Sequence, residues 1–396
     1  MSASLETMHA GESAAERAPE IAPRTWLLLG DKRGDNGQVE AITAALGWPL
    51  QRYTMSWVKP YDVAKPAVRA TLDHVNREAS DRFGPPWPDL IITVGRRPSM
   101  VAAWIKEQSG GHTRLVLFGK PSGLVEHFDL IVATGESQMP PMDNVVMIPM
   151  PLMRVDEEEI RRDSEHWRDR LQDLPRPLIG IFVGGPTGPY FYDEGLAARF
   201  LAYGRQTIEN TGGTPYFVTS RRTPKELTAR LAAGLPEQAK LSAWDPTNPE
   251  NPYKALLGHA DGFVVTGDSI SMMVEIARLR RPLKIFPLPL TALAKLDQLR
   301  RRLTVRVFAH DLHDNHQAVW RRRLARTLFK LNILHQTRDF EAFQQMLIKR
   351  GMATGLEGAF VSPTAVLEDG AAKAARRIAR MMGATVTAPE PQPRRP

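Results

Sequence analysis

The sequence predicts an α/β fold of two similar, doubly wound domains with a cleft between them. The first observation is an internal similarity, because residues 89–100 align with residues 261–272 without a gap, at a constant offset of 172 residues. Each copy is an apolar run rich in Ile and Val, then glycine and a polar loop, then Ser-Met at the start of an apolar helical pattern. This order is typical of a buried parallel strand that leads into a helix. The second observation is the length of 396 residues, which is too long for one ordinary core.

In the first half of the chain, short apolar runs alternate with helical patterns, as in a parallel sheet with helices on both faces. A glycine-rich turn at 31–37 leads into a helix that ends at Gly47, and glycine is the usual residue after a helix. The predicted strands are 25–30, 48–53, 90–94, 115–118 and 130–133, and the predicted helices are 38–46, 68–79 and 99–106.

A charged helix at 156–174 precedes a second round of the same alternation. Its predicted strands are 178–183, 214–218, 241–244, 263–266 and 283–286, and its predicted helices are 194–210, 224–235, one from 251–253 onward, and 271–278. Past Pro289 the pattern is helical and irregular, and it closes with a basic helix at 365–382. Both rounds predict Rossmann-like domains.

These patterns divide the chain into seven parts. They are a disordered tail (1–23), an N-terminal Rossmann-like domain (24–155), a linking helix (156–176), a C-terminal Rossmann-like domain (177–304), a basic helical insertion (305–338), a C-terminal helical segment (339–383) and a second disordered tail (384–396).

The composition excludes several classes of protein. The sequence has no cysteine, which excludes disulfides, Cys-ligated zinc, iron–sulfur clusters and a thiol nucleophile. No apolar run approaches the roughly 18 residues of a membrane span, and the N-terminus lacks the apolar core of a secretory signal. We therefore expect a cytoplasmic protein, peripheral on a membrane only if its basic segment binds lipid.

That basic segment lies in the most strongly charged part of the chain. Residues 276–330 contain 14 Lys or Arg and three Asp, a local excess of +11 against +8 for the whole chain. An acidic partner is expected near it, either phosphate, anionic lipid or nucleic acid. Residues 321–330 fit an anionic membrane surface or, alternatively, a core-packed helix with a basic outer face. Nucleic acid is the weakest of these partners, because no reading motif is recognisable.

Three histidines, His310, His313 and His316, are close enough in sequence to suggest zinc. A solvated turn is the preferred interpretation, and we predict no metal site.

The candidate binding residues follow the predicted strands, where ligands of doubly wound sheets bind. Gly184 and Gly185 allow close approach of the backbone to a ligand and leave amides free for a phosphate. Arg221 and Arg222 would add charge-assisted bonds to the same phosphates. Taken alone, the glycine pair also fits a tight turn and the arginines fit surface charges.

The two copies of the repeat carry different polar groups after their strands. Arg96 and Arg97 follow the first, whereas Asp268, Ser269 and Ser271 follow the second. Hydroxyls and amides at a helix N-terminus favour an anion. Glu275, one turn further on, would accept hydrogen bonds from a ribose diol. Alternatively, its negative charge would only interact favourably with the dipole at the helix N-terminus.

Seven ordered motifs, spread over residues 24–300, together resemble the Elm-type (elongated mitochondria) fission family, which has plant and many bacterial members. They are Gly30–Gly34 with Asn36 and Gln38, Gly95–Arg97, Gly184–Pro186, Thr219–Thr223, Glu250–Tyr253, Thr266–Met272 with Glu275, and Phe286–Pro289. The resemblance implies a two-domain glycosyltransferase-like fold of the GT-B type.

The resemblance also implies roles for particular residues. The C-terminal domain would hold a nucleotide-sugar, with Glu275 on the ribose, Tyr253 in the same site, and Gly185, Arg221, Ser269 and Ser271 around the diphosphate. The N-terminal domain would hold the acceptor near Asp31, Asn36, Arg96 and Arg97. The plant members of the family are known instead for recruiting a division GTPase to a membrane.

From the sequence we therefore expect transfer of a sugar from a nucleotide-sugar to an acceptor, without a metal or any cofactor beyond that substrate. Asp31 is the expected general base, because a carboxylate in the cleft can deprotonate a hydroxyl, and Asp268 is the competing candidate. The alternative function is a non-catalytic, membrane-associated adaptor.

Overall fold

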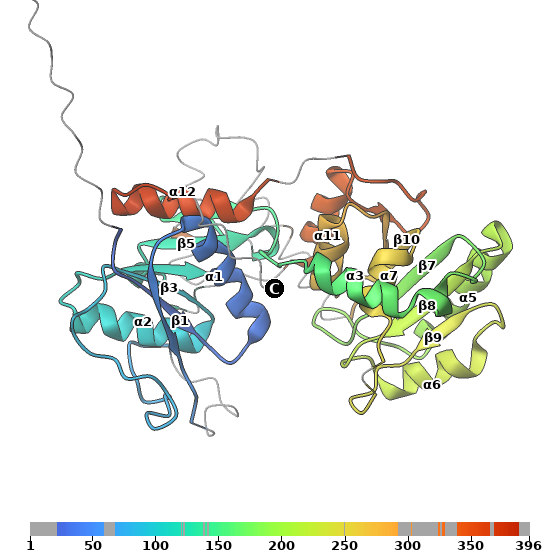
Figure 1. Ribbon diagram of the computed structural model, residues 1–396, viewed down its shortest axis with the longest axis horizontal. Coiled ribbons are helices and arrows are strands. Elements are labelled where there is room, and N and C mark those ends of the chain that lie inside the picture. Colours follow the sequence, from blue (N-terminus) through green and yellow to red (C-terminus); the bar gives the residue numbers. More distant parts are fainter. Residues whose placement is uncertain are drawn as a thin grey trace, which may run out of the picture.

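The computed structural model describes residues 22–58, 68–119, 121, 123–137, 139–140, 142–248, 250–291, 302, 324, 327–328, 339–364 and 368–387. Two six-stranded sheets form within these residues, each in its own lobe, and the two lobes lie side by side (Figure 1). Every pairing between neighbouring strands is parallel. The predicted fold class, two Rossmann-like doubly wound domains, is confirmed.

The first sheet has the strand order β2-β1-β3-β4-β5-β6. Its strands are β1 (Thr25–Leu29), β2 (Leu50–Thr54), β3 (Leu90–Val94), β4 (Arg114–Phe118), β5 (Leu130–Thr134) and β6 (Val145–Ile148), and its main helices are α1 (Arg33–Leu46) and α2 (Arg96–Gln108). From β1 the chain passes to β2 on one side and then to β3 on the other. The topological switch point therefore lies between β1 and β3.

The second sheet has the order β12-β11-β10-β7-β8-β9. Its strands are β7 (Leu178–Val183), β8 (Thr214–Thr219), β9 (Lys240–Ser242), β10 (Gly262–Thr266), β11 (Leu283–Phe286) and β12 (Thr354–Gly355). Its helices are α5 (Gly195–Thr211), α6 (Lys225–Gly234), α7 (Tyr253–His259) and α8 (Ile270–Arg278). The switch point lies between β7 and β10, so the two copies of the sequence repeat, β3-α2 and β10-α8, occupy the same place in their domains.

Each sheet is buried on both faces, which is why its strands are continuous apolar runs. In the first domain, one core includes residues of α1 and another includes residues of α2. In the second domain, α7 and α8 contribute to one core, whereas α5 and α6 contribute to the other.

The chain crosses between the domains twice. The first crossing leads into α3 (Glu157–His166) and the short α4 (Arg168–Leu171), and Asp156 caps α3 by accepting a hydrogen bond from the amide of Glu159 at 3.0 Å. After α11 (Phe340–Lys349) and β12 the chain returns as α12 (Gly370–Met382). Figure 1 shows α12 lying along the first lobe, where it contacts α1 and β6.

One predicted helix is wrong. Residues 68–79 form turns and a single bridge between Trp57 and Val75, not a helix. The side chain of Thr71 accepts from the amide of Asp73, and that of Asn76 accepts from the amides of Glu78 and Ala79. Such local side-chain bonds offer the backbone an alternative to a helix.

Two further features bear on the sequence predictions. β6 and β12 were not predicted, and α1 and α2 begin several residues earlier than expected. The histidines at 310–316 and most of the basic segment at 305–338 lie outside the described residues. No helix within the described ranges is long and apolar enough to cross a membrane.

Candidate functional site

The polar loops predicted from the sequence lie at the two topological switch points. Gly30 follows β1 and Gly95 follows β3 in the first domain, whereas Gly184 follows β7 and Gly267 follows β10 in the second. Ligands of open parallel sheets bind outside the carboxyl ends of the strands at such points. Each domain therefore contributes one candidate half-site.

In the first half-site, Asn36 holds the end of β1. Its side-chain oxygen accepts from the amide of Gly30 at 3.2 Å, and its side-chain nitrogen donates to the carbonyl of Gly30 at 2.9 Å. The loop after β3 packs against the same point, because a Cβ placed on Gly30 would lie 3.3 Å from the ring of Pro98. Asp31 follows directly and is exposed. Asn36 thus shapes the loop that presents Asp31.

An aromatic and basic cluster lies beside this loop. The guanidinium of Arg97 lies over the ring of Trp57, 5.5 Å from its centroid, and Trp57 stacks on His74. The Nε2 atom of His74 lies 3.1 Å from the carbonyl oxygen of Arg97. His74 is fully buried, and this burial lowers its pKa. Arg96 and Arg97 are half-buried, so a rigid aromatic base positions a cation at the switch point.

Asp268 is the buried centre of the second half-site. Its carboxylate accepts from the amide of Gly185 at 3.0 Å and from the hydroxyl of Tyr192 at 3.1 Å, and lies 3.8 Å from the guanidinium of Arg222. Burial raises the pKa of Asp268, although these donors and Thr266 oppose the shift. Burial and the neighbouring Asp268 likewise raise the pKa of Tyr192.

The glycine pair after β7 is required by this packing. A Cβ on Gly184 would lie 2.4 Å from a carboxylate oxygen of Asp268, and one on Gly185 would lie 2.3 Å from the carbonyl oxygen of Arg222. The amide of Gly184 donates to the hydroxyl of Thr266 at 2.8 Å, and that of Gly185 donates to Asp268. We expected these amides to be free for a phosphate, whereas the structure gives each a protein acceptor. The tight-turn interpretation accounts for both glycines.

The loop after β8 is attached to the same turn. The hydroxyl of Thr223 donates to the carbonyl of Gly184 at 2.5 Å, and the guanidinium of Arg222 donates to the hydroxyl of Thr187 at 2.5 Å. Arg221 is exposed at the rim of this loop. Two guanidinium groups therefore lie near the switch point, one fixed and one at the surface.

Helix α8 starts at the switch point and presents Glu275 on its second turn. Ser269, the N-cap residue, is buried, and Ser271 is exposed. The carboxylate of Glu275 accepts from the hydroxyl of Tyr253 at 2.7 Å and from the ammonium of Lys254 at 2.5 Å. Burial is the largest single effect on the pKa of Lys254 and lowers it, but the carboxylates of Glu275 and Glu159 together outweigh burial, so the net shift is upward. Glu275 is thus the buried partner of an ion pair with the half-buried Lys254.

A pocket with a volume of about 350 Å³ opens at the ends of β8 and β9. Trp244, whose side chain is partly exposed, lines it together with polar residues of the loop that follows, including Asp245, Asn248 and Asn251. Asn251 accepts from the amide of Tyr253 at 3.0 Å, and Tyr253 reaches Glu275. The pocket is therefore linked to the Glu275 cluster by hydrogen bonds through Tyr253. Sequence reasoning missed it, although the aromatic-polar run 244–251 marks it.

No group of His, Cys, Asp or Glu suited to hold a metal ion occurs among the residues that the structure describes.

Comparisons with known proteins give a consistent family. A sequence profile of the family described as Mitochondrial fission ELM1 matches residues 33–328. The Mitochondrial fission protein ELM1 of Arabidopsis thaliana is 26% identical over 220 residues, which cover 50% of this chain and 51% of that protein. The chain thus aligns with about half the length of the plant relative.

Two further similarities are more distant. An uncharacterized protein of Rickettsia prowazekii (strain Madrid E) is 23% identical over 301 residues, covering 66% of this chain and 82% of that one. Among solved structures, UDP-GlcNAc 2-epimerase from Methanocaldococcus jannaschii has a TM-score of 0.44 and 12% identity over 91% of this chain and 99% of that one. At this score the similarity carries no information about activity.

Proposed function

The chain belongs to the mitochondrial fission ELM1 family, and from that premise we propose that it transfers a sugar from a nucleotide-sugar to an acceptor. The observation that carries the proposal is the asymmetry of the two switch points. One presents Asp31 and two arginines, and the other presents arginines, a helix N-terminus and the Glu275 cluster. Different sets of polar groups at the strand ends of the two domains suit two different substrates that meet between the domains.

The nucleotide is assigned to the second domain. The indole of Trp244 would stack on the base, as aromatic rings do on every nucleobase. The carboxylate of Glu275 has lone pairs beyond those used by Tyr253 and Lys254 and would accept from the ribose hydroxyls. The diphosphate would lie at the N-terminus of α8 near Arg221 and Arg222, where the helix dipole and two cations favour an anion.

The acceptor is assigned to the first domain, with Asp31 as general base. Helix α11 supports this arrangement because it reaches both sheets at their carboxyl ends. The amide of Asp339, its N-cap residue, donates at 2.8 Å to the carbonyl of Glu136, just after β5. One turn further, the side chain of Gln344 donates at 2.8 Å to the carbonyl of Gly267, just after β10. One short helix therefore touches the ligand-binding edge of each domain.

The test is release of nucleoside diphosphate from a panel of nucleotide-sugars, with cell extract as the source of acceptor. Asp31→Asn should leave nucleotide affinity nearly unchanged and reduce turnover about 10²–10⁴-fold, the range for a lost general base. Asp35→Asn, in the first turn of α1, is the matched control. The proposed transfer needs no metal, since the sequence has no Asp-x-Asp motif, so EDTA should not change the rate.

The alternative is the non-catalytic adaptor on a membrane surface, which the name of the plant relative favours. It predicts nucleotide binding without diphosphate release from any donor above a heat-killed control. It also predicts that the protein sediments with anionic vesicles at low salt and is released as salt rises. Replacing Arg321, Arg322, Arg323 and Arg326 by Gln should abolish that sedimentation. Loss of sedimentation with turnover retained would make the basic segment an anchor of the enzyme.

A further inference from the structure

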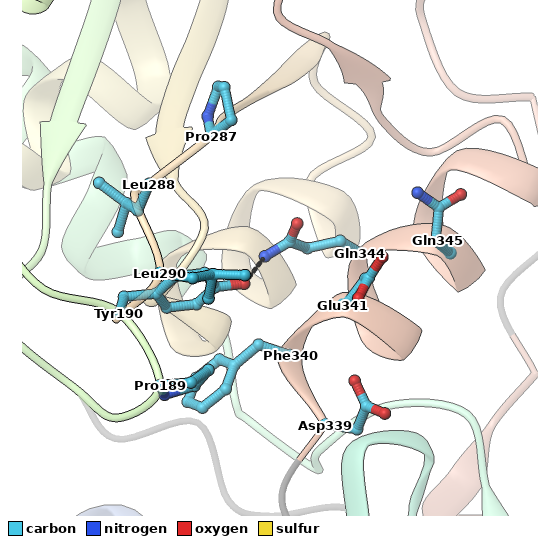
Figure 2. Close-up of a pocket in the computed structure, with 10 residues that line it drawn as sticks. All are labelled: Pro189, Tyr190, Pro287, Leu288, Leu290, Asp339, Phe340, Glu341, Gln344 and Gln345. Carbon is cyan, nitrogen blue, oxygen red and sulfur yellow. Dashed lines mark hydrogen bonds between the residues drawn. The ribbon is translucent and has the colours of Figure 1, made fainter. Parts of the chain in front are cut away.

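We propose that the pocket between α11 and the loops after β7 and β11 binds the sugar unit of the donor, and that it selects an uncharged sugar. The inference rests on the proposed function and adds a subsite to it. The pocket has a volume of about 200 Å³. Its ten lining residues are drawn in Figure 2: Pro189, Tyr190, Pro287, Leu288, Leu290, Asp339, Phe340, Glu341, Gln344 and Gln345.

The lining combines two kinds of surface. Prolines, leucines and the rings of Tyr190 and Phe340, which meet edge to face with centroids 5.6 Å apart, form an apolar wall. The N-cap residue and the first two turns of α11 contribute two carboxylates and two amides on the other side (Figure 2). An apolar wall with a few placed polar groups is typical of a small-molecule site. Hydroxyl groups on a ring need acceptors and donors together, which carboxylates and amides supply.

The position of the pocket connects it to the second switch point. The amide nitrogen of Gln344 donates to the hydroxyl of Tyr190 at 2.9 Å and to the carbonyl of Gly267 at 2.8 Å. Gly267 directly precedes Asp268, and a Cβ at Gly267 would lie 2.6 Å from the Gln344 nitrogen. Gln344, which lines the pocket, is therefore bonded to the turn beside the proposed diphosphate position.

The order of the strands places the pocket at one end of a linear site. The Trp244 pocket lies at β8 and β9, the switch point lies between β7 and β10, and the α11 pocket lies at β11. At about 4.8 Å between neighbouring strands, β11 lies about 14 Å from β8 and about 19 Å from β9 along the edge of the sheet. A nucleotide-sugar has its base at one end, its diphosphate in the middle and its sugar at the other end. The three positions follow the same order.

Size and charge narrow the ligand. At about 30 Å³ per water molecule, the volume holds the equivalent of about seven waters, which suits one monosaccharide and not a second nucleotide. Asp339 and Glu341 both line the pocket, and Glu341 also pairs with Arg302 at 3.2 Å. Two carboxylates in a small, partly enclosed space disfavour a third. A neutral hexose is therefore expected to bind better than a uronic acid.

The test is calorimetry with UDP, GDP and ADP and with the glucose conjugate of each. For the nucleoside diphosphate that binds, Gln344→Ala should lower the affinity for its glucose conjugate about 5- to 10-fold, the effect of one or two lost hydrogen bonds. The same change should alter the affinity for the free diphosphate less than twofold. The glucuronic acid conjugate should bind wild type more weakly than the glucose conjugate, and Glu341→Gln should narrow that difference. Gln206→Ala, an exposed position on α5, is the matched control and should change nothing.

The outcomes separate the subsite from the function on which it rests. If the diphosphate binds and both Gln344→Ala and Glu341→Gln leave the conjugates unchanged, the subsite is wrong and the nucleotide site stands. If Gln344→Ala lowers the affinity for the free diphosphate as much as the affinity for the conjugate, Gln344 does not act on the sugar, and the subsite is also wrong. If wild type binds none of the diphosphates and none of the conjugates, the proposed function itself fails.

Discussion

At the scale of single residues, the second half-site is built as a packed unit before any ligand is present. Asp268 accepts from Gly185 and Tyr192, and the two glycines after β7 have no room for a side chain. The same residues that line the proposed diphosphate position therefore also hold three strand-end loops together. Substitutions here affect folding as well as binding, and the two effects have to be measured separately.

Gly184→Ala should destabilise the protein by about 1–3 kcal/mol, the usual cost of overpacking a filled site. The added Cβ would lie 2.4 Å from a carboxylate oxygen of Asp268, which is fixed by its own hydrogen bonds. Urea unfolding measures the change. Gly37→Ala in α1 is the control, because its Cβ meets nothing within 4 Å and the change should stabilise the helix by about 0.5–1 kcal/mol. Equal effects at the two positions would contradict the packing described for the turn.

The raised pKa of Asp268 predicts an unusual pH dependence. Burial makes the folded protein hold the Asp268 proton more tightly than the unfolded chain, where the pKa is about 4. The contribution of Asp268 to stability should therefore fall as pH rises from about 4 through its folded pKa. The measurement is the difference in unfolding free energy between wild type and Asp268→Asn at several pH values. The unfolding free energy of wild type minus that of Asp268→Asn should fall as pH rises. A rise of this difference with pH would show that the donors to Asp268 outweigh its burial.

At the scale of elements, α12 completes a core that is made mostly by the other end of the sequence. Ala374, Ala375 and Ile378 are fully buried among residues of α1, β3 and β5. The indole of Trp48 donates to the carbonyl of Thr385 at 2.8 Å, just after the helix. The helix is basic on its outer side and apolar on its inner side, so its position follows from burial.

Ile378→Ala should lower the unfolding free energy by about 2–4 kcal/mol, as expected for a large-to-small change at a fully buried site. Arg376→Ala, on the exposed side of the same helix, should change it by less than about 0.5 kcal/mol. Thermal or urea unfolding followed by the intrinsic tryptophan fluorescence measures both changes. Similar small effects of both changes would mean that α12 is not part of the core.

The strands were the most predictable elements, and the reason is physical. Strands buried on both faces must be apolar throughout, so β1, β3, β7, β8 and β10 are visible as continuous runs. β12 has two residues and carries no such signal. The helix predicted at 68–79 failed because Thr71 and Asn76 bond to nearby amides, which periodicity does not reveal.

The candidate site was predictable in its location but not in its contacts. The glycine and polar residues after the strands identified both switch points, because the carboxyl ends of parallel strands lie on one edge. Lys254, which pairs with Glu275, and Gln344, which bonds to Tyr190 154 residues away, were missed. Lys254 directly follows the predicted site residue Tyr253, but the contacts of both residues exist only after the chain folds.

At the scale of the whole molecule, Arg278 lies where the two crossings between the domains meet. It belongs to α8 of the second domain, donates to the carbonyl of Pro151 in the first crossing at 3.2 Å, and feels the charge of Asp369, the N-cap of α12. One side chain therefore connects the second domain to both crossing segments. Loss of the Arg278 side chain should therefore weaken the contacts between the domains more than it weakens the packing of either core.

Arg278→Ala should speed hydrogen exchange at the amide of Leu152, which donates to the side chain of Gln38, and at the first amides of α12. About a tenfold increase is expected if one charge-assisted bond is lost. Amides of the central strands should keep their protection. The exposed Arg205→Ala on α5 is the control. Unchanged hydrogen exchange at both crossing segments would show that Arg278 does not stabilise the connection between the domains.

The return of α12 to the first domain also sets the order in which a growing chain can fold. β6 ends at Ile148 and α12 begins at Gly370, so about 220 residues are synthesised between them. At a synthesis rate of about 5–20 residues per second, the surface formed by α1 and β6 therefore leaves the ribosome about 10–45 s before α12, which covers it. The second domain has most of its strands by then. The domain made first is thus completed last, and its apolar face stays uncovered during that interval.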